Sequence, residues 1–183
     1  MRETQRKTIE GWIDKASNQL QAAREYAKSS YRCSEAVQAA QECVELSVKA
    51  ILSFLGVEYP RAHEWDPEKK PFGQIARQIS ERRLLEKLAE QNLSHSVPLP
   101  RLLLLMNFWS QFYVAAKYGF EAEYLASAHE LFRTDDAKLA VAHADECYRA
   151  ASALRYHDRD KLAVLSRSRA AQQGNGAGER RPG

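Results

Sequence analysis

The chain has 183 residues, of which 44% are hydrophobic and 28% are charged. This length and composition are ordinary for one globular domain with a sizeable core, so folding needs no disulfide or metal. The net charge of +3 arises in residues 155–183, where seven Arg or Lys stand against three Asp or Glu. The rest of the chain is nearly neutral, which weakens the charge as a sign of nucleic-acid binding.

Neither a secretory signal nor a membrane-spanning segment is predicted. The first ten residues, MRETQRKTIE, contain no apolar stretch, and the most apolar run, residues 102–106, is too short to cross a bilayer. The three cysteines, Cys33, Cys43 and Cys147, follow amphipathic helical patterns and form no CxxC pair. We therefore predict a cytoplasmic protein with small buried thiols and with no metal and no cofactor.

Two amphipathic helices are predicted at the start of the chain. Apolar residues recur at helical spacing over residues 5–28 and again over residues 31–55. The second segment is rich in small residues, which indicates close packing against neighbouring helices. Gly56 follows it, and we expect this glycine to end the helix in the left-handed conformation, where a residue without Cβ is least strained.

Residues 57–71 contain three prolines and predict a loop. A third helix is expected over residues 72–92, with a basic polar face made by Arg77, Arg82, Arg83 and Lys87. A fourth helix, residues 101–118, follows Pro98 and Pro100 and ends at Gly119. It is apolar on nearly all sides, which indicates a central helix or an oligomer interface.

After a short helical segment over residues 121–131, the last long helix is expected to begin near Thr134, a good N-cap residue. No strand pattern is present. The order of the segments predicts an all-α, up-and-down antiparallel bundle of four to five long helices. We assign the bundle to residues 1–165 and expect residues 166–183, which lack an apolar period, to be a disordered basic tail.

The stretch AVQAAQECVELSVKAILSFLGVEYPRAHE joins a helix of small and aliphatic residues to a Pro-Arg-x-His loop. It resembles the second helix and the following loop of the HEPN family (higher eukaryotes and prokaryotes nucleotide-binding domain). The matching positions are Ala39, Ala40, Gln41, Val44, Glu45, Leu46, Lys49, Ala50, Leu52, Gly56, Pro60, Arg61 and His63. The resemblance extends over roughly residues 5–156 and implies a helical bundle of the HEPN type.

Many members of that family are metal-independent ribonucleases with an arginine, four to six further residues and a histidine. In such a site histidine transfers protons and arginine stabilises the charge on the phosphorus centre. None of the five histidines here has an arginine at that spacing. Lys138 before His143 comes nearest, but lysine lacks the bidentate fork. We therefore assign no catalytic residue and keep only His63 and His143 as candidates.

Two groups of residues are candidates for binding. Arg61 and His63 suit a phosphate or a partner's carboxylate, or they cap a helix end. Tyr113, Lys117 and Tyr118 combine a cation with rings on which a base can stack, or they form the rim of the core.

Our first hypothesis is a non-catalytic, homodimeric binding or partner module. The resemblance implies association with a minimal nucleotidyltransferase, or a role in a toxin–antitoxin or RNA-linked defence system. Two alternatives stay open. One is a divergent metal-independent ribonuclease that uses His63 with Arg61, or His143 with Lys138. The other is a passive RNA or nucleotide binder that uses the basic face of the third helix and the basic tail.

Overall fold

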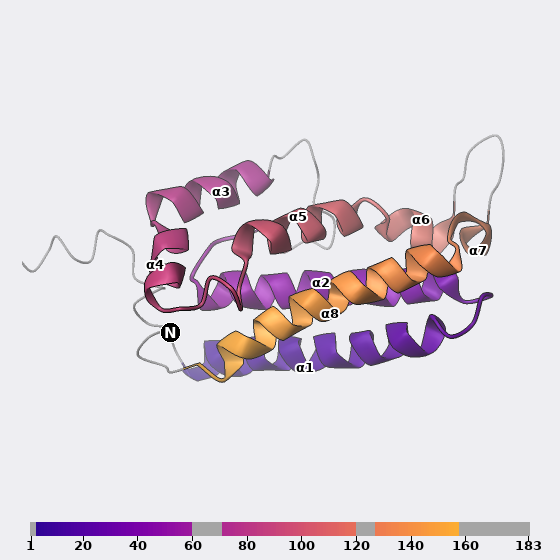
Figure 1. The fold of residues 1–183 in the computed structure, drawn as a ribbon, viewed down its shortest axis with the longest axis horizontal. Coiled ribbons are helices and arrows are strands. Elements are labelled where there is room, and N and C mark those ends of the chain that lie inside the picture. Colours follow the sequence, from indigo (N-terminus) through magenta and orange to yellow (C-terminus); the bar gives the residue numbers. More distant parts are fainter. Residues whose placement is uncertain (1–2, 60–70, 120–126, 158–183) are drawn as a thin grey trace, which may run out of the picture.

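The computed structural model describes residues 3–59, 71–119 and 127–157 (Figure 1). These ranges form α-helices and contain no strand, which confirms the all-α prediction. The helices are α1 (Glu3–Tyr26), α2 (Cys33–Phe54), α3 (Pro71–Glu81), α4 (Leu84–Glu90), α5 (Leu99–Ser110), α6 (Tyr113–Tyr118), α7 (Ala128–Leu131) and α8 (Thr134–Arg155). The expected tail, residues 166–183, and the loop with Arg61 and His63 lie outside the described residues.

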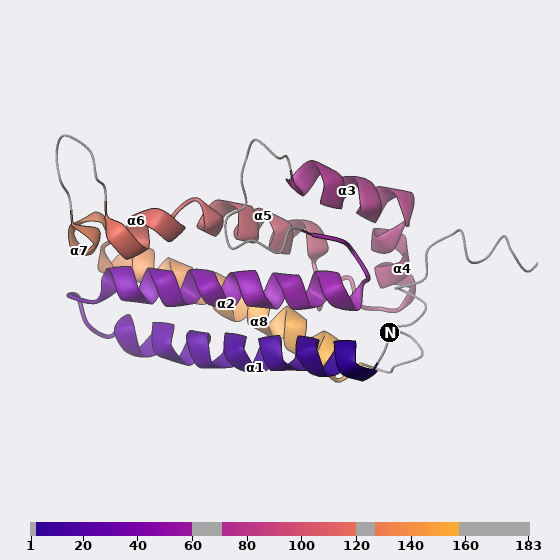
Figure 2. The same ribbon diagram turned by 180° about the vertical axis from the view of Figure 1, so that it is seen from behind.

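The bundle is built around α2. Helices α1 and α8 run beside it, and α5 and α6 lie along its other side (Figures 1 and 2). Helix α1 turns its periodic apolar residues, from Ile9 to Ala23, into this core. Helix α2 is buried on nearly all sides, so it is the central helix of the domain. The fourth predicted helix is therefore not central: α5 keeps an apolar face that the described chain leaves exposed.

Small residues make the contact between α2 and α8 close. Ala144, Cys147 and Ala151 of α8 are fully buried, and the Cys43 thiol of α2 lies 3.7 Å from the Ala144 carbonyl oxygen. Burial raises the pKa of Cys43 to about 12 and also raises the pKa of Cys147, because a thiolate loses its hydration there. Both thiols therefore stay protonated, as expected for small core residues.

Two helix ends follow the local glycine signals, and the start of α8 differs from the prediction in its cap residue. Gly56 (φ 66°) follows α2 and Gly119 (φ 79°) ends α6, and both have the positive φ that glycine adopts without strain. Helix α8 begins at Thr134, but the N-cap position is Arg133. The backbone N–H of Arg133 donates to the Asp136 carboxylate at 2.8 Å, so Asp136 supplies the capping bond that we expected from Thr134.

Two predicted helices are each divided in the structure. The expected helix over residues 72–92 breaks between α3 and α4 at Arg83, which adopts a left-handed conformation (φ 51°). The expected helix over residues 101–118 begins at Leu99 and breaks into α5 and α6 at residues 111–112. Neither break has a glycine or proline in the sequence, so local breaker signals do not find them.

Polar bonds tie α3 to the end of α2. The Arg82 guanidinium donates to the Gly56 carbonyl at 2.7 Å and to the Leu55 carbonyl at 2.6 Å. The Gln78 amide accepts from the Glu58 backbone N–H at 2.8 Å and donates to the Glu58 carbonyl at 2.9 Å. Carbonyls at a helix C-terminus have no partner within the helix and favour a cation. These bonds fix the junction of α3 and α4 beside α2.

We predict that Arg82→Met lowers the free energy of unfolding by about 1–3 kcal/mol, because two carbonyls lose a charged donor. Urea unfolding followed by circular dichroism measures this change. Arg77→Met is the matched control, since in the described part of the chain Arg77 pairs with Glu81 on the same exposed face of α3. It should change stability by less than about 0.5 kcal/mol. Equal effects of the two substitutions would contradict the anchoring role of Arg82.

Candidate functional site

The structure places the candidate side chains in two separate groups. His143 lies on α8, against Trp109 of α5. Tyr113, Lys117 and Tyr118 all lie on α6, where they contact one another.

The His143 imidazole is bound to a buried tryptophan. The Trp109 indole Nε1–H donates to His143 Nδ1 at 3.1 Å, and the two rings meet at an angle with centroids 6.0 Å apart. An indole nitrogen can only donate. His143 Nδ1 must therefore carry the lone pair, and the proton of the neutral ring is on Nε2.

The surroundings of His143 favour this neutral form. Burial is the main cause that lowers its pKa, and the Arg101 guanidinium lowers it further, while Glu146 partly opposes them. Arg101 and Glu146 pair across α5 and α8, with nitrogen–oxygen distances of 3.2 and 3.3 Å. The imidazole is thus held neutral and in one tautomer at the contact between the two helices.

This geometry does not suit His143 for proton transfer. A general base at Nε2 requires the proton on Nδ1, and that tautomer would break the bond from Trp109. Lys138 offers no help within one copy of the chain, because five residues place it about 140° from His143 around α8. Lys138 is exposed and approaches Asp135 at 4.0 Å. The described residues therefore bring no second charged group of the expected pair to His143.

Three large apolar side chains are exposed on the two helices that make this contact. Leu104 is 58% exposed, Phe108 44% and Leu139 46%. Phe108 packs edge-on against Trp109, with centroids 5.0 Å apart, and Leu139 lies one turn of α8 before His143. We call these three residues the α5–α8 patch. Exposed apolar side chains mark a binding surface where they form a continuous patch, so these three residues are candidates for one.

The α6 residues form a compact cationic unit. Lys117 Nζ lies 5.0 Å from the centre of the Tyr118 ring and 5.6 Å from that of the Tyr113 ring. It donates to the Tyr113 hydroxyl at 3.4 Å. Interactions with the Tyr118 and Tyr113 hydroxyls raise the pKa of Lys117, so the ammonium stays charged. Tyr118 is 60% exposed and leaves a ring face available for stacking.

The arginines on the basic face of α3 and α4 already bond to other groups of the protein. Arg82 bonds to the end of α2, Arg77 reaches Glu81 at 2.8 Å, and Arg83 approaches Glu86 at 3.5 Å. Exposed pairs of this kind are weak, but they reduce the local positive potential. The face is therefore a less favourable phosphate surface than its sequence suggests.

A buried polar row on α2 was not predicted from the sequence. Gln41, Glu45 and Lys49 are 3%, 4% and 7% exposed, and all three belong to the family-like positions. Glu45 accepts from Lys49 Nζ at 2.5 Å and from Gln41 Nε2 at 3.2 Å. Burying such groups is costly unless they are paired, so the row fixes their arrangement in the core. These polar residues recur every four positions in an otherwise apolar helix, and this spacing could have predicted the row.

Other site classes find no support in the part of the chain that the structure describes. There, no three His, Cys, Asp or Glu side chains gather in a way that suits a metal ion. Among the same residues, no helix has the length and apolar character to span a membrane.

Comparison with known proteins finds a family match over part of the chain. Residues 9–67 match the model of the HEPN domain, which confirms the resemblance noted in the second helix. The match begins at Ile9 in α1, includes the whole of α2 and its polar row, and extends into the loop that follows. No curated protein and no solved structure matches the chain.

We predict that the pKa of His143 lies below its ordinary value of 6.5. The stability that this neutral histidine contributes is then complete above pH 6.5 and is lost as the pH falls through the lowered pKa. An NMR titration of the histidine ring protons measures the value. Trp109→Phe should raise it, because the neutral ring loses its donor, whereas Trp12→Phe on α1 should leave it unchanged. A value at or above 6.5 in the unmodified protein would contradict the description of the site.

Proposed function

We propose that this chain, whose residues 9–67 match the HEPN domain, is a non-catalytic binding module that acts as a homodimer with a protein partner. The HEPN match suggests a module in a nucleotide-related or RNA-related process. We use the match to infer the kind of process but not the reaction, because fold and family do not by themselves define chemistry.

The observation that carries the proposal is the bond from Trp109 to His143. This bond occupies Nδ1 of His143, and the lowered pKa of His143 keeps its ring neutral. No histidine of the chain has an arginine at the family's spacing. A ribonuclease of this type needs both groups, one for proton transfer and one for phosphate charge. Binding without cleavage is therefore the function that agrees best with these residues.

The α5–α8 patch supports a homodimer. Leu104, Phe108 and Leu139 present apolar surface on the two helices joined by the Trp109–His143 bond, and an isologous interface would cover the same patch on both copies. The Arg101–Glu146 pair at one end of the seam supplies the polar rim typical of interfaces. For the protein partner, the family resemblance favours a minimal nucleotidyltransferase or a component of a toxin–antitoxin or RNA-linked system.

A second candidate function, nucleotide or RNA binding without cleavage, is favoured by the α6 unit. Lys117 can neutralise a phosphate while the exposed ring of Tyr118 stacks on a base. Arg61 and His63 belong to the same proposal as further phosphate contacts, although their loop is outside the described residues. This function is compatible with the homodimer and differs from it in its dependence on salt.

We predict that the purified protein has twice the mass of one chain in sedimentation equilibrium. Leu104→Glu should weaken the dimer by about tenfold or more, because a charge enters the apolar interface. Tyr31→Glu is the matched control, since Tyr31 is 85% exposed but lies between α1 and α2, outside the patch. A monomer at high protein concentration, or equal effects of both substitutions, would contradict the proposed interface.

A further inference from the structure

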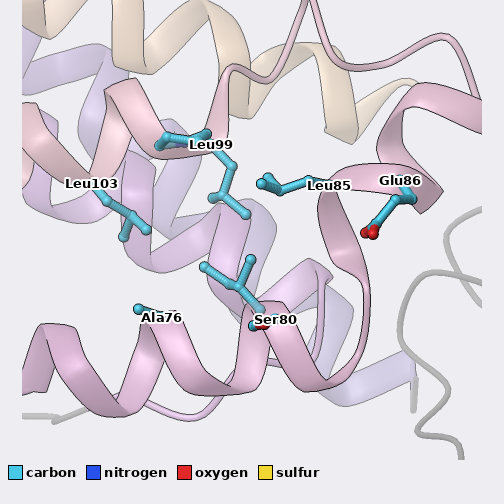
Figure 3. Close-up of a pocket in the computed structure, with 8 residues that line it drawn as sticks. Ala76, Ser80, Leu85, Glu86, Leu99 and Leu103 are labelled. Carbon is cyan, nitrogen blue, oxygen red and sulfur yellow. The ribbon is translucent and has the colours of Figure 1, made fainter.

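A second apolar feature of the molecule is a pocket between α3, α4 and α5 (Figure 3). It has a volume of about 400 Å³, and its apolar lining includes Ile79, Leu85, Leu99 and Leu103. Ser80 and Glu86 supply the polar atoms at its edge. Figure 3 shows Leu85 of α4 pointing toward Leu99 and Leu103 of α5 around this space. The pocket thus has apolar side chains on several sides.

The anchoring of α3 explains why the hollow exists. Helix α3 is held by polar bonds from Arg82 and Gln78 to the end of α2, near residues 55–58. These bonds fix the α3–α4 junction without drawing α3 onto the side of α5, and α3 stands away from α5 in Figure 1. In a folded domain, a space of this volume is normally filled by side chains. The pocket therefore has room for apolar side chains from another segment.

We propose that the pocket is the docking site of the chain's own residues 161–166. The 26 residues that follow His157 contain one run of larger apolar side chains, Leu162, Val164 and Leu165, and are otherwise polar or small. Leu162 and Leu165 are three positions apart, so one turn of helix can direct both into the same hollow. This proposal does not depend on the proposed function.

The position of α8 places this run within reach. The C-terminal end of α8 and helix α4 lie at the same end of the molecule in both views (Figures 1 and 2). An extended chain spans about 3.4 Å per residue, so Leu162 and Leu165 can reach about 17 and 27 Å from His157. Lys161 and Arg167 flank the run, and the carboxylate of Glu86 at the pocket edge can face one of them. The apolar contact supplies the affinity and the charges set the direction.

Disulfide trapping in the full-length protein tests the docking. Ser80→Cys puts a thiol at the pocket edge, and Ser166→Cys puts one directly after the apolar run. The native cysteines are buried, so they compete little. Under mild oxidation we expect a bond within one chain that forms about tenfold faster than in the control pair Ser80→Cys with Asn175→Cys. An undocked tail would give similar rates for both pairs.

The remaining outcomes overturn the proposal. A disulfide between two chains, seen by mixing differently tagged copies, would assign the pocket to a second copy's tail. Equal rates of disulfide formation in the two cysteine pairs would indicate that the tail does not dock, and the pocket would then be a site for a separate partner. As an independent readout, Leu162→Asp with Leu165→Asp should increase hydrogen exchange in α3 and α4, whereas Ala170→Asp with Ala171→Asp should not. An unchanged exchange pattern in the first variant would also overturn the docking.

Discussion

The burial of α2 is the constraint on which the rest of the structure depends. A helix enclosed on nearly all sides can have only small or apolar residues where its neighbours approach, and α2 meets α8 through alanine and cysteine. A polar group on such a helix is costly unless it is paired within the protein. Glu45 pairs with Gln41 Nε2 and with Lys49, whereas Gln41 Oε1 is buried without a hydrogen bond from the described residues. Arg82 satisfies the carbonyls where α2 ends. The position of α3 follows from that last contact.

The functional proposals arise where this packing leaves surface uncovered. Helix α5 is apolar on nearly all sides, but only one side can face α2 and α8, so Leu104 and Phe108 remain outside. Beneath them, the Trp109–His143 bond orders the seam and removes the ring nitrogen that proton transfer would need. The same arrangement thus explains the exposed apolar side chains and the unsuitable geometry of His143 for proton transfer. The Lys117 unit lies on α6, the helix that follows α5 in the chain.

Much of the fold could be predicted because its signals are local. The helical period located the long helices, and Gly56 and Gly119 marked two ends through their positive φ. The division at Arg83 could not be predicted, because it accompanies contacts of Arg82 with carbonyls 26 and 27 positions earlier in the chain. The bond between Trp109 and His143 could not be predicted for the same reason, because the two residues are 34 positions apart in the chain. The α6 unit was predictable, because Tyr113 and Lys117 are one turn apart.

If this HEPN-matching chain binds without cleaving, labelled RNA stays intact when it is incubated with the full-length protein in EDTA. The incubation is made across salt concentrations, with cleavage and retention read together. We expect intact RNA at every salt concentration. Retention that falls with salt and in Lys117→Ala would favour the second candidate function, and no retention would favour a protein partner. Cleavage that His143→Ala or His63→Ala abolishes, while the control His95→Ala does not, would contradict the account.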